Sequence, residues 1–367
     1  MSRRAIADNS DGDRLVAEWM RRAIDIARDT QPHPNPRVGA VVVSPNGELL
    51  AEAAHRGPGE PHAEAAALAA AGSAAAGGSL YVTLEPCDHD GRTPPCTVAI
   101  VESGVSTVYV GAFDPDDRVS GRGIERLRDA GIRVEECRDS AGVTELDPGY
   151  FHHRRTGRPR VTLKLAATLD GQTAAEDGTS QWITSAEARV DAHLLRARSD
   201  AVMVGAGTLR ADDPRLDARD AASGEKQPRP VIVGGRSPLP ESARVYERNP
   251  LIYSPQRLGV VPDGVELEVM WDPAGVDLDA MMKDLGGRGI VDLLVEGGAT
   301  LGRALLDANL VDHLVVYLAA SLAGGSGRPM FDGIFRTLHA VTPLEIVSVR
   351  RVGPDLRIDA VPASGEA

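Results

Sequence analysis

Cysteine and aromatic residues are scarce in this chain of 367 residues, which has three cysteines and an aromatic content of 4%. So few cysteines cannot form the disulfide framework of a small secreted domain, and they favour a reducing compartment, the cytoplasm. The low aromatic content argues against a polynucleotide path lined by stacking side chains. No apolar run has the length of a transmembrane helix, and the charged segment 1–14 does not resemble a signal peptide.

Positive charge is also in deficit, because the formal net charge is -13. This charge disfavours partners that bind through bulk phosphate attraction, such as duplex DNA, but it leaves room for local basic pockets that hold small phosphates. We therefore expect a small-molecule ligand, with neither nucleic acid nor a membrane as a partner. The length predicts two domains, each with its own core.

The strongest local signal lies between His62 and Cys96. One residue separates His62 from Glu64, and Pro-Cys pairs follow at Cys87 and Cys96. One imidazole and two thiolates supply three of the four tetrahedral positions that zinc prefers, and an open fourth position is typical of catalytic zinc. Glu64 is too close to His62 in sequence for a helical ligand pair, so we predict that it transfers protons. This pattern is the signature of zinc nucleobase deaminases.

Two other interpretations of this segment stay open at the level of sequence. Isolated cysteines and histidines are often ordinary buried or surface residues, and a zinc ion held there could be purely structural. The spacing also departs from the general signature, because eight residues rather than two separate Cys87 from Cys96. The intervening segment 88–95 is polar and rich in turn-forming residues, so it can loop out and return the second thiolate to the metal.

The order of helices and strands in the first half predicts an α/β domain. A proline-rich turn holds Asn35 just before a strand. We expect strands over 38–43, 49–55, 80–84, 107–110 and 132–136, and helices over 15–28, 63–71, 97–102 and 123–130. The segment 150–160 is basic and aperiodic, so we expect a linker there, between a first domain at 1–149 and a second at 161–367.

The second half alternates in the same way. We expect strands over 161–166, 201–204, 230–233, 251–253, 265–271 and 291–295, and helices over 186–197 and 278–285. The last strand runs into Glu296, two glycines and a helix to Asp307, a turn that suits a phosphate but also occurs for topological reasons alone. Polar clusters follow other strands at 171–185 and 205–214, where α/β proteins bind ligands, although Trp182 could equally be a core or interface aromatic.

Residues 22–358 resemble the bifunctional riboflavin-biosynthesis deaminase/reductase family, in which a zinc pyrimidine deaminase is fused to a reductase. The long spacing between the two cysteines is normal in that family. The resemblance is carried by the segments 33–36 (HPNP), 59–64 (GEPHAE), 84–87 (LEPC), 91–96 (GRTPPC), 169–171 (LDG), 180–185 (SQWITS), 211–214 (ADDP) and 295–298 (VEGG).

The resemblance implies an α/β protein with an N-terminal cytidine-deaminase-like α/β/α zinc domain and a C-terminal dihydrofolate-reductase-like α/β domain. It implies hydrolytic deamination of 2,5-diamino-6-(5-phosphoribosylamino)pyrimidin-4(3H)-one, followed by reduction of the ribosyl group to a ribityl chain. The implied cofactors are Zn²⁺ and NADPH. We also expect a homo-oligomer.

The family's site residues carry over to the matching positions of this sequence. In the deaminase, His62, Cys87 and Cys96 would hold zinc, Glu64 would be catalytic and Asn35 would bind the base. The reductase substrate positions correspond to Ser180, Arg196, Leu216, Arg219 and Glu296. The cofactor positions correspond to Ala166, Trp182, Thr208, Asp212, Gly298, Ala299, Thr300, Leu301, Gly302, Arg303 and Ala304. One position departs from the family, because Gly235 stands where a serine is frequent, and its side-chain hydrogen bond to the nucleotide is lost.

Two competing hypotheses belong to other functional classes. A zinc deaminase of a free nucleoside or a tRNA base, with an unrelated nucleotide-binding C-terminal domain, would leave the clusters around Ser180 and Glu296 unexplained. A zinc-stabilised nucleotide-binding scaffold without catalysis would give Glu64 no purpose beside an open metal position. Assay of purified protein with the diaminopyrimidine phosphate, with and without NADPH, distinguishes the three.

Overall fold

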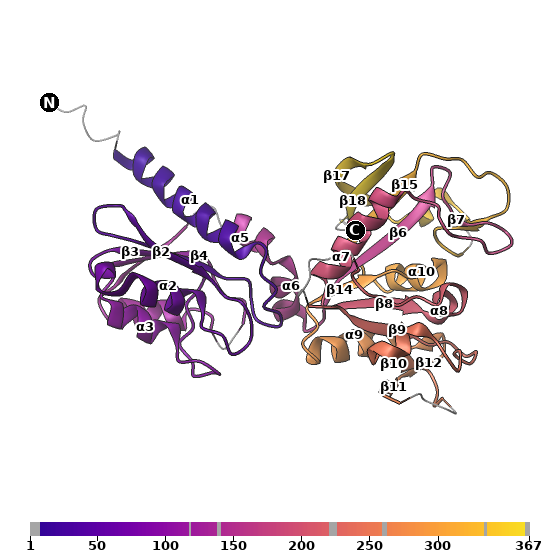
Figure 1. Cartoon of the computed structure of the whole chain (residues 1–367), viewed down its shortest axis with the longest axis horizontal. Helices are drawn as coiled ribbons and strands as arrows, with labels where there is room; N and C mark the ends of the chain where they lie inside the picture. Colours follow the sequence, from indigo (N-terminus) through magenta and orange to yellow (C-terminus); the bar gives the residue numbers. More distant parts are fainter. Residues whose placement is uncertain are drawn as a thin grey trace. The chain divides into compact units, whose positions relative to one another are not determined.

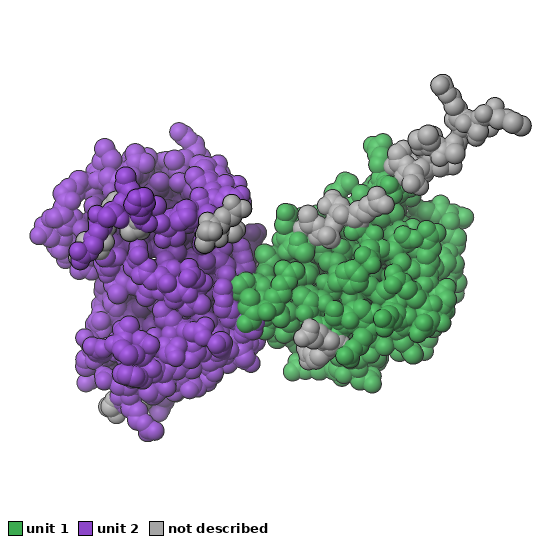
Figure 2. Space-filling view, turned by 180° about the vertical axis from the view of Figure 1, so that it is seen from behind, with its two compact units in different colours: residues 1–156 green, residues 157–367 purple. Residues whose placement is uncertain are grey.

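The computed structural model describes residues 8–116, 119–137, 141–219, 226–258, 263–333 and 336–363. Part of the charged segment 1–14, residues 1–7, lies outside these ranges. The chain divides into two compact units, Met1–Thr156 and Gly157–Ala367, which Figure 2 shows in different colours. None of the helices in the described ranges combines the length and the apolar character that crossing a membrane requires.

The N-terminal unit is built on a five-stranded sheet with the order β2-β1-β3-β4-β5. Strand β1 pairs antiparallel with β2 and β3, whereas β3, β4 and β5 are parallel. The strands are β1 (Gly39–Val43), β2 (Leu49–Ala54), β3 (Ser79–Leu84), β4 (Thr107–Ala112) and β5 (Arg133–Glu136). The predicted first-half strands are therefore all present, with ends shifted by a few residues.

Helices cover both faces of this sheet and make a three-layer α/β/α unit (Figure 1). On one face, α1 and α5 pack their apolar residues against Val41, Val43 and Tyr81. On the other face lie α2 and α3, which contact each other, and α2 also contacts β1. The helices are α1 (Asp8–Ala27), α2 (Ala63–Ala71), α3 (Cys96–Ser103), α4 (Arg122–Asp129) and α5 (Ala141–Leu146).

The prediction that residues 150–160 form an aperiodic linker is wrong in its local structure. Residues Pro148–Thr156 form helix α6, and strand β6 begins at Arg160. The basic residues of the segment concealed an amphipathic helix, in which Tyr150 and Phe151 are buried and Arg154 lies over the Tyr150 ring. The hydroxyl of Tyr150 donates to the carboxylate of Asp114 at 3.1 Å, which fastens α6 to the first unit.

The C-terminal unit contains a nine-stranded sheet with the order β11-β10-β9-β8-β14-β6-β15-β18-β17. In this order, neighbouring strands from β11 to β15 run parallel to each other. At the other end, β18 runs antiparallel to both of its neighbours, β15 and β17. Their bounds are β6 (Arg160–Thr168), β8 (Ala201–Gly205), β9 (Arg229–Val233), β10 (Leu251–Ser254), β11 (Glu266–Val269), β14 (Asp292–Val295), β15 (His313–Ala319), β17 (Leu344–Val352) and β18 (Asp355–Pro362).

Two apolar cores lie on opposite faces of this sheet. Helices α9 (Leu278–Gly287) and α10 (Ala299–Asp307) cover one face, where Met281, Leu285 and Leu305 are fully buried. Helices α7 (Ala186–Arg198) and α8 (Ala206–Asp212) contribute Leu195 and Leu209 to the core on the other face. The unit is thus a second three-layer arrangement (Figure 1).

Two details of the second unit differ from the sequence expectation. The strand expected over 265–271 is broken at Met270 into β11 and the short β12 (Trp271–Asp272), which turns away to pair with β13 (Gly275–Val276). No element was expected after Asp307, yet β15, β17 and β18 complete the sheet. The short strands β7 (Gln172–Ala174) and β16 (Arg328–Pro329) pair with each other beside it.

The burial of α6 residues in the first unit predicts where that unit can be cut. A fragment 1–149 lacks Tyr150 and Phe151, whereas a fragment 1–156 keeps them. We expect 1–149 to be less stable by roughly 3 kcal/mol or more, because burying a large apolar side chain contributes about 1.5–3 kcal/mol. Urea denaturation of both fragments measures this difference, and equal stability would contradict the assignment of α6 to the first unit.

Candidate active sites

The three predicted zinc ligands come together in the first unit. Their ligand atoms, one nitrogen of His62 and the sulfurs of Cys87 and Cys96, all lie within 4.8 Å of one another. His62 is the N-cap residue of α2, Cys87 follows β3, and Cys96 begins α3. The segment 88–95 does loop out, as its composition predicts, and the Thr97 amide then donates to the Cys87 carbonyl at 3.2 Å.

The donor geometry fits a tetrahedral zinc ion. Nδ1 of His62 lies 3.0 Å from Sγ of Cys96 and 3.5 Å from Sγ of Cys87. Zinc bonds of about 2.0–2.3 Å place tetrahedral donors roughly 3.5–3.8 Å apart, close to these separations. Nε2 of His62 lies 3.2 Å from the hydroxyl of Thr93, a contact that orients the ring with Nδ1 toward the thiols. Thr93 was not singled out in the sequence, because a lone threonine in a turn carries no signal.

Glu64 lies in the first turn of α2, beside the ligand atoms and almost fully buried. Burial raises the pKa of its carboxyl to about 6, and the nearby Cys87 adds to this effect. A carboxyl whose pKa lies near neutrality can both accept and release a proton at physiological pH. The position and environment of Glu64 are therefore those of a proton-transfer group.

A cavity of about 400 Å³ opens beside Glu64, and Asn35 and His55 contribute to its wall. Nδ2 of Asn35 lies 3.0 Å from Nε2 of His55, and Nδ1 of His55 lies 3.1 Å from the carbonyl oxygen of Pro61. His55 therefore donates to the carbonyl and accepts from the amide. This pairing leaves Oδ1 of Asn35 as the group that can accept a hydrogen bond from a ligand. His55 was missed in the sequence, where it appears only as the end of a strand.

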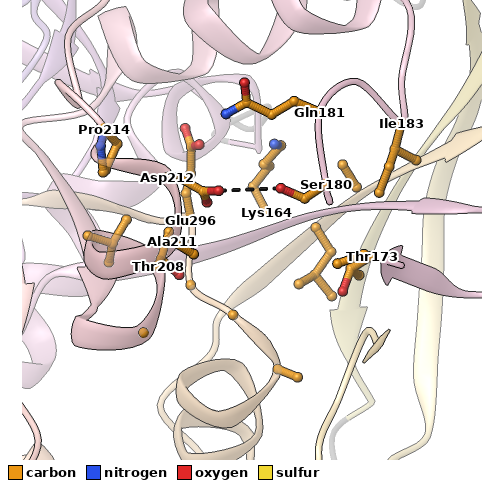
Figure 3. A pocket seen from close by; sticks show the side chains of 18 of the residues that line it. Lys164, Thr173, Ser180, Gln181, Ile183, Thr208, Ala211, Asp212, Pro214 and Glu296 are labelled. Carbon is orange, nitrogen blue, oxygen red and sulfur yellow. Dashed lines mark hydrogen bonds between the residues drawn. The ribbon is translucent and has the colours of Figure 1, made fainter. Parts of the chain in front are cut away.

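A larger cavity, of about 1050 Å³, lies in the second unit over the carboxyl ends of β6, β8 and β14. Figure 3 shows the side chains of Lys164 on β6, Ser180 in the loop at 178–184 and Glu296 after β14 around it. The hydroxyl of Ser180 donates to the carboxylate of Asp212 at 3.3 Å across the cavity. The wall contains seven cationic side chains but only three carboxylates, so it suits an anionic ligand in spite of the negative charge of the whole chain.

Arg196 and Glu296 form a bidentate ion pair in this wall. Nε and Nη2 of Arg196 donate to the two carboxylate oxygens at 2.6 and 2.9 Å, and Nη1 donates to the carbonyl of Asp217 at 2.9 Å. Although burial opposes ionisation of Glu296, the charges of Arg196 and Lys164 lower its pKa to about 2. Glu296 is thus a fixed anion, and the Arg196 guanidinium, expected at a substrate position, is already engaged by a carboxylate.

The structure gathers every predicted substrate position of the reductase in this cavity. Leu216 stands apart from the others, because its side chain is buried in the core and its backbone is in the left-handed region (φ 55°). It therefore offers the cavity mainly backbone groups. The residues concerned are Ser180, Arg196, Leu216, Arg219 and Glu296.

Only some of the predicted cofactor positions line this cavity. Seven of them line the cavity, namely Ala166, Trp182, Thr208, Asp212, Gly298, Ala299 and Thr300. The other four follow along helix α10 outside the lining. Leu301 is buried in the core, Gly302 packs near Phe331, and Arg303 pairs with Asp307. Ala304 also lies within the helix.

The lining of this cavity also includes the side chains of Trp182 and Lys164. Trp182 is 66% exposed, with the guanidinium of Arg189 4.5 Å from its ring centre, so the alternative of a core aromatic is wrong. Lys164 points into the cavity from the middle of β6, near Glu296 (Figure 3). Sequence analysis missed Lys164, because a single lysine in an alternating strand resembles an ordinary surface residue.

Two family models match the chain, one for each unit. The zinc-binding region of cytidine and deoxycytidylate deaminases matches residues 14–112, and the RibD C-terminal domain matches residues 159–358. The riboflavin biosynthesis protein RibD of Escherichia coli is 38% identical, over 94% of this chain and 99% of that protein. RibD of Mycobacterium tuberculosis is 38% identical, over 90% and 91% of the two chains.

Solved structures agree over the whole length. Acinetobacter baumannii RibD has 36% identity and a TM-score of 0.89, and the match covers 96% of this chain and all of that one. A diaminohydroxyphosphoribosylaminopyrimidine deaminase/5-amino-6-(5-phosphoribosylamino)uracil reductase of Thermotoga maritima has 34% identity and a TM-score of 0.87, with the same coverage. The first unit is cytidine-deaminase-like and the second is dihydrofolate-reductase-like, and the chain belongs to the RibD family of bifunctional riboflavin biosynthesis enzymes.

Proposed function

We propose that the first unit removes the 2-amino group of 2,5-diamino-6-(5-phosphoribosylamino)pyrimidin-4(3H)-one by hydrolysis, and that the second unit reduces the ribosyl group of the product with NADPH. The observation that carries the proposal is that each unit contains its own cavity with its own chemically suitable residues. His62, Cys87 and the carboxyl of Glu64 line the first, with Cys96 close to the other two candidate ligands, and a cationic wall with a fixed carboxylate lines the second.

In the deamination, zinc bound by His62, Cys87 and Cys96 would supply Lewis-acid activation of a water nucleophile. Glu64 would take a proton from the attacking water and pass it to the leaving amino group. Asn35, held by His55, would accept a hydrogen bond from the pyrimidine edge and so present the amino-bearing carbon to Glu64. These roles account for the presence of Asn35, His55 and Glu64 in the lining of one cavity.

In the reduction, NADPH would supply the hydride. Trp182, Thr208, Asp212 and the start of α10 would hold the dinucleotide, because they line the cavity and present an aromatic face, polar groups and free backbone N-H donors. The cationic wall favours a phosphorylated cofactor and a phosphorylated substrate. Glu296, kept ionised by Arg196, would accept hydrogen bonds from the sugar hydroxyls of the substrate.

The cellular compartment and the oligomeric state belong to the same proposal. We propose that the enzyme works in the cytoplasm, because a reducing environment keeps the two thiol ligands from oxidation. We also propose that the chain works as a homo-oligomer.

Replacing Glu64 should separate the two activities. Glu64→Gln keeps the size of the side chain and removes its proton transfer, so ammonia release should fall on the order of 10²–10⁴-fold. Zinc content and NADPH oxidation with previously deaminated substrate should be unchanged. Glu102→Gln, at an exposed position on α3, is the matched control. Near-full ammonia release by Glu64→Gln would overturn the role of Glu64.

Metal removal should have the same selectivity. Dialysis against a strong chelator should abolish ammonia release and leave NADPH oxidation with previously deaminated substrate intact, since the three ligands belong to the first unit alone. Readdition of one equivalent of zinc should restore deamination. Loss of both activities on chelation would mean that the metal also supports the reductase.

Replacing Arg196 tests the ion pair in the reductase. Arg196→Ala leaves a buried carboxylate without its partner, and Arg196→Lys cannot reproduce the bidentate contact. Both variants should weaken substrate binding at least roughly tenfold, because a charge-assisted contact is worth about 1.5–3 kcal/mol. NADPH affinity, measured by fluorescence quenching, should be unchanged. Arg198→Ala, exposed on the same helix, is the control. A collapse of cofactor affinity alone would reverse the assignment.

A further inference from the structure

The turn that carries Asn35 has little backbone support of its own. It lies between α1 and β1, outside both elements. Pro32, Pro34 and Pro36 have no N-H group to donate. The amide of Asn35 donates to the carbonyl of Pro32 at 3.1 Å. Because such a turn has few N-H groups, the place of Asn35 in the deaminase cavity depends on side chains that bind the turn from other elements.

Asp147 binds both ends of this turn with one buried carboxylate. Nε2 of His33 donates to its Oδ1 at 3.0 Å. On the other side of Asn35, the backbone amide of Arg37 donates to Oδ2 at 2.9 Å, and the Arg37 guanidinium donates to Oδ1 at 3.1 Å. The side chains of His33 and Asp147 are only 3% and 2% exposed, so water does not compete for these contacts. One carboxylate therefore fixes positions 33 and 37 relative to each other, with Asn35 midway between them.

The same carboxylate is itself held in place at the start of α6. The amide of Tyr150 donates to Oδ1 of Asp147 at 3.2 Å. Since Asp147 directly precedes Pro148, the first residue of α6, this is the contact of a helix N-cap. Although burial opposes ionisation of Asp147, the hydrogen bond and charge of His33 and the charge of Arg37 hold its pKa below the usual range. An ionised carboxylate only accepts hydrogen bonds, so it can serve all of these donors at once.

A second residue of α6 reaches the turn beside Asn35. Nη2 of Arg154 donates to the carbonyl of Pro34, the residue just before Asn35, at 3.2 Å. The guanidinium lies over the ring of Tyr150, 5.0 Å from its centre, and Nε lies 3.6 Å from the carboxylate of Asp116. These contacts hold the Arg154 guanidinium between α6 and the turn. Helix α6 therefore binds the turn at three places, before, beside and after Asn35.

We propose that Asp147 and Arg154 are positioning residues of the deaminase, which hold the backbone of Asn35 where its side chain can accept a hydrogen bond from the pyrimidine. His55 orients the Asn35 amide, whereas Asp147 and Arg154 fix the chain that carries it. Such support matters because a misplacement of about 1 Å can cost roughly 10²-fold in rate. The inference rests on the proposed role of Asn35 and makes α6 part of the deaminase site.

The first test is a double-mutant cycle between Asp147 and Asn35, measured as kcat/KM for ammonia release. Asp147→Ala alone should lower kcat/KM on the order of 10–10²-fold, mainly through KM, because Glu64 lies on another element, α2. In an Asn35→Ala background the same change should cost less than about threefold, since the residue that it positions is already gone. Zinc content and NADPH oxidation with previously deaminated substrate show that each variant is folded. A full loss in both backgrounds would overturn the positioning role.

The second test removes a more exposed contact, so it decides the question even if Asp147→Ala does not fold. Arg154→Met loses the donor to the Pro34 carbonyl, and kcat/KM for ammonia release should fall roughly 3–10-fold. Arg154→Lys can still donate to this carbonyl and should keep most of the activity. In an Asn35→Ala background, Arg154→Met should have little further effect. A loss that persists in full there would mean that the guanidinium acts on the ligand directly, against the proposal.

Arg155→Met is the matched control for Arg154→Met. Arg155 lies on the same helix with its guanidinium 5.7 Å from the centre of the Phe151 ring, and it is exposed. It shares with Arg154 the contact to an aromatic ring of α6, so its replacement tests the helix without the turn. Ammonia release should be unchanged in Arg155→Met. An equal loss in both variants would show that α6 acts only through the stability of the unit.

The same assays distinguish failure of this inference from failure of the proposed function. If the diaminopyrimidine phosphate is not the substrate, the unmodified protein releases no ammonia from it. If only the positioning role is wrong, the unmodified protein releases ammonia, Glu64→Gln abolishes the release, and the effects of Asp147→Ala and Asn35→Ala on kcat/KM multiply. The expected result is ammonia release by the unmodified protein together with strong coupling between Asp147 and Asn35.

Discussion

Both active sites depend on one constraint, which is that parallel strands end at the same edge of a sheet. In the first unit, β3 leads to Cys87 and the neighbouring β4 leads to Asp114, and both residues line the deaminase cavity. In the second unit, β8 leads to α8 and β14 leads to Glu296. Side chains that are distant in sequence converge because the strand order brings their loops together.

The ionisable side chains at these two sheet edges differ, and each set suits a different ligand. The zinc ligands and the buried Glu64 form a compact site in which a carboxyl has a pKa near neutrality. In the larger cavity, Arg196 keeps Glu296 ionised, and further cations favour phosphate. The proposed phosphorylated ligands are compatible with a net charge of -13, since local placement of charge outweighs the total at contact distance.

The two ends of the large sheet show how the same architecture treats its free edges. Ion pairs of Glu266 and Glu268 close one end, whereas a bulged apolar strand with Ile346 and Val349 stands open at the other. Backbone pairing is satisfied within the inner strands, so the two edges differ in character through their side chains.

Local sequence signals predicted the candidate ligand set His62, Cys87 and Cys96, the proton-transfer role expected of Glu64, and most strands of both sheets, because spacing and apolar alternation are local properties. It did not reveal helix α6, whose apolar residues are hidden among arginines, or the strands after Asp307. The three-dimensional structure was needed to show that Arg196 engages Glu296, that His55 orients Asn35, and that Lys164 enters the cavity. These contacts join residues 20 to 100 or more positions apart, and a lone charged or polar residue does not specify its partner.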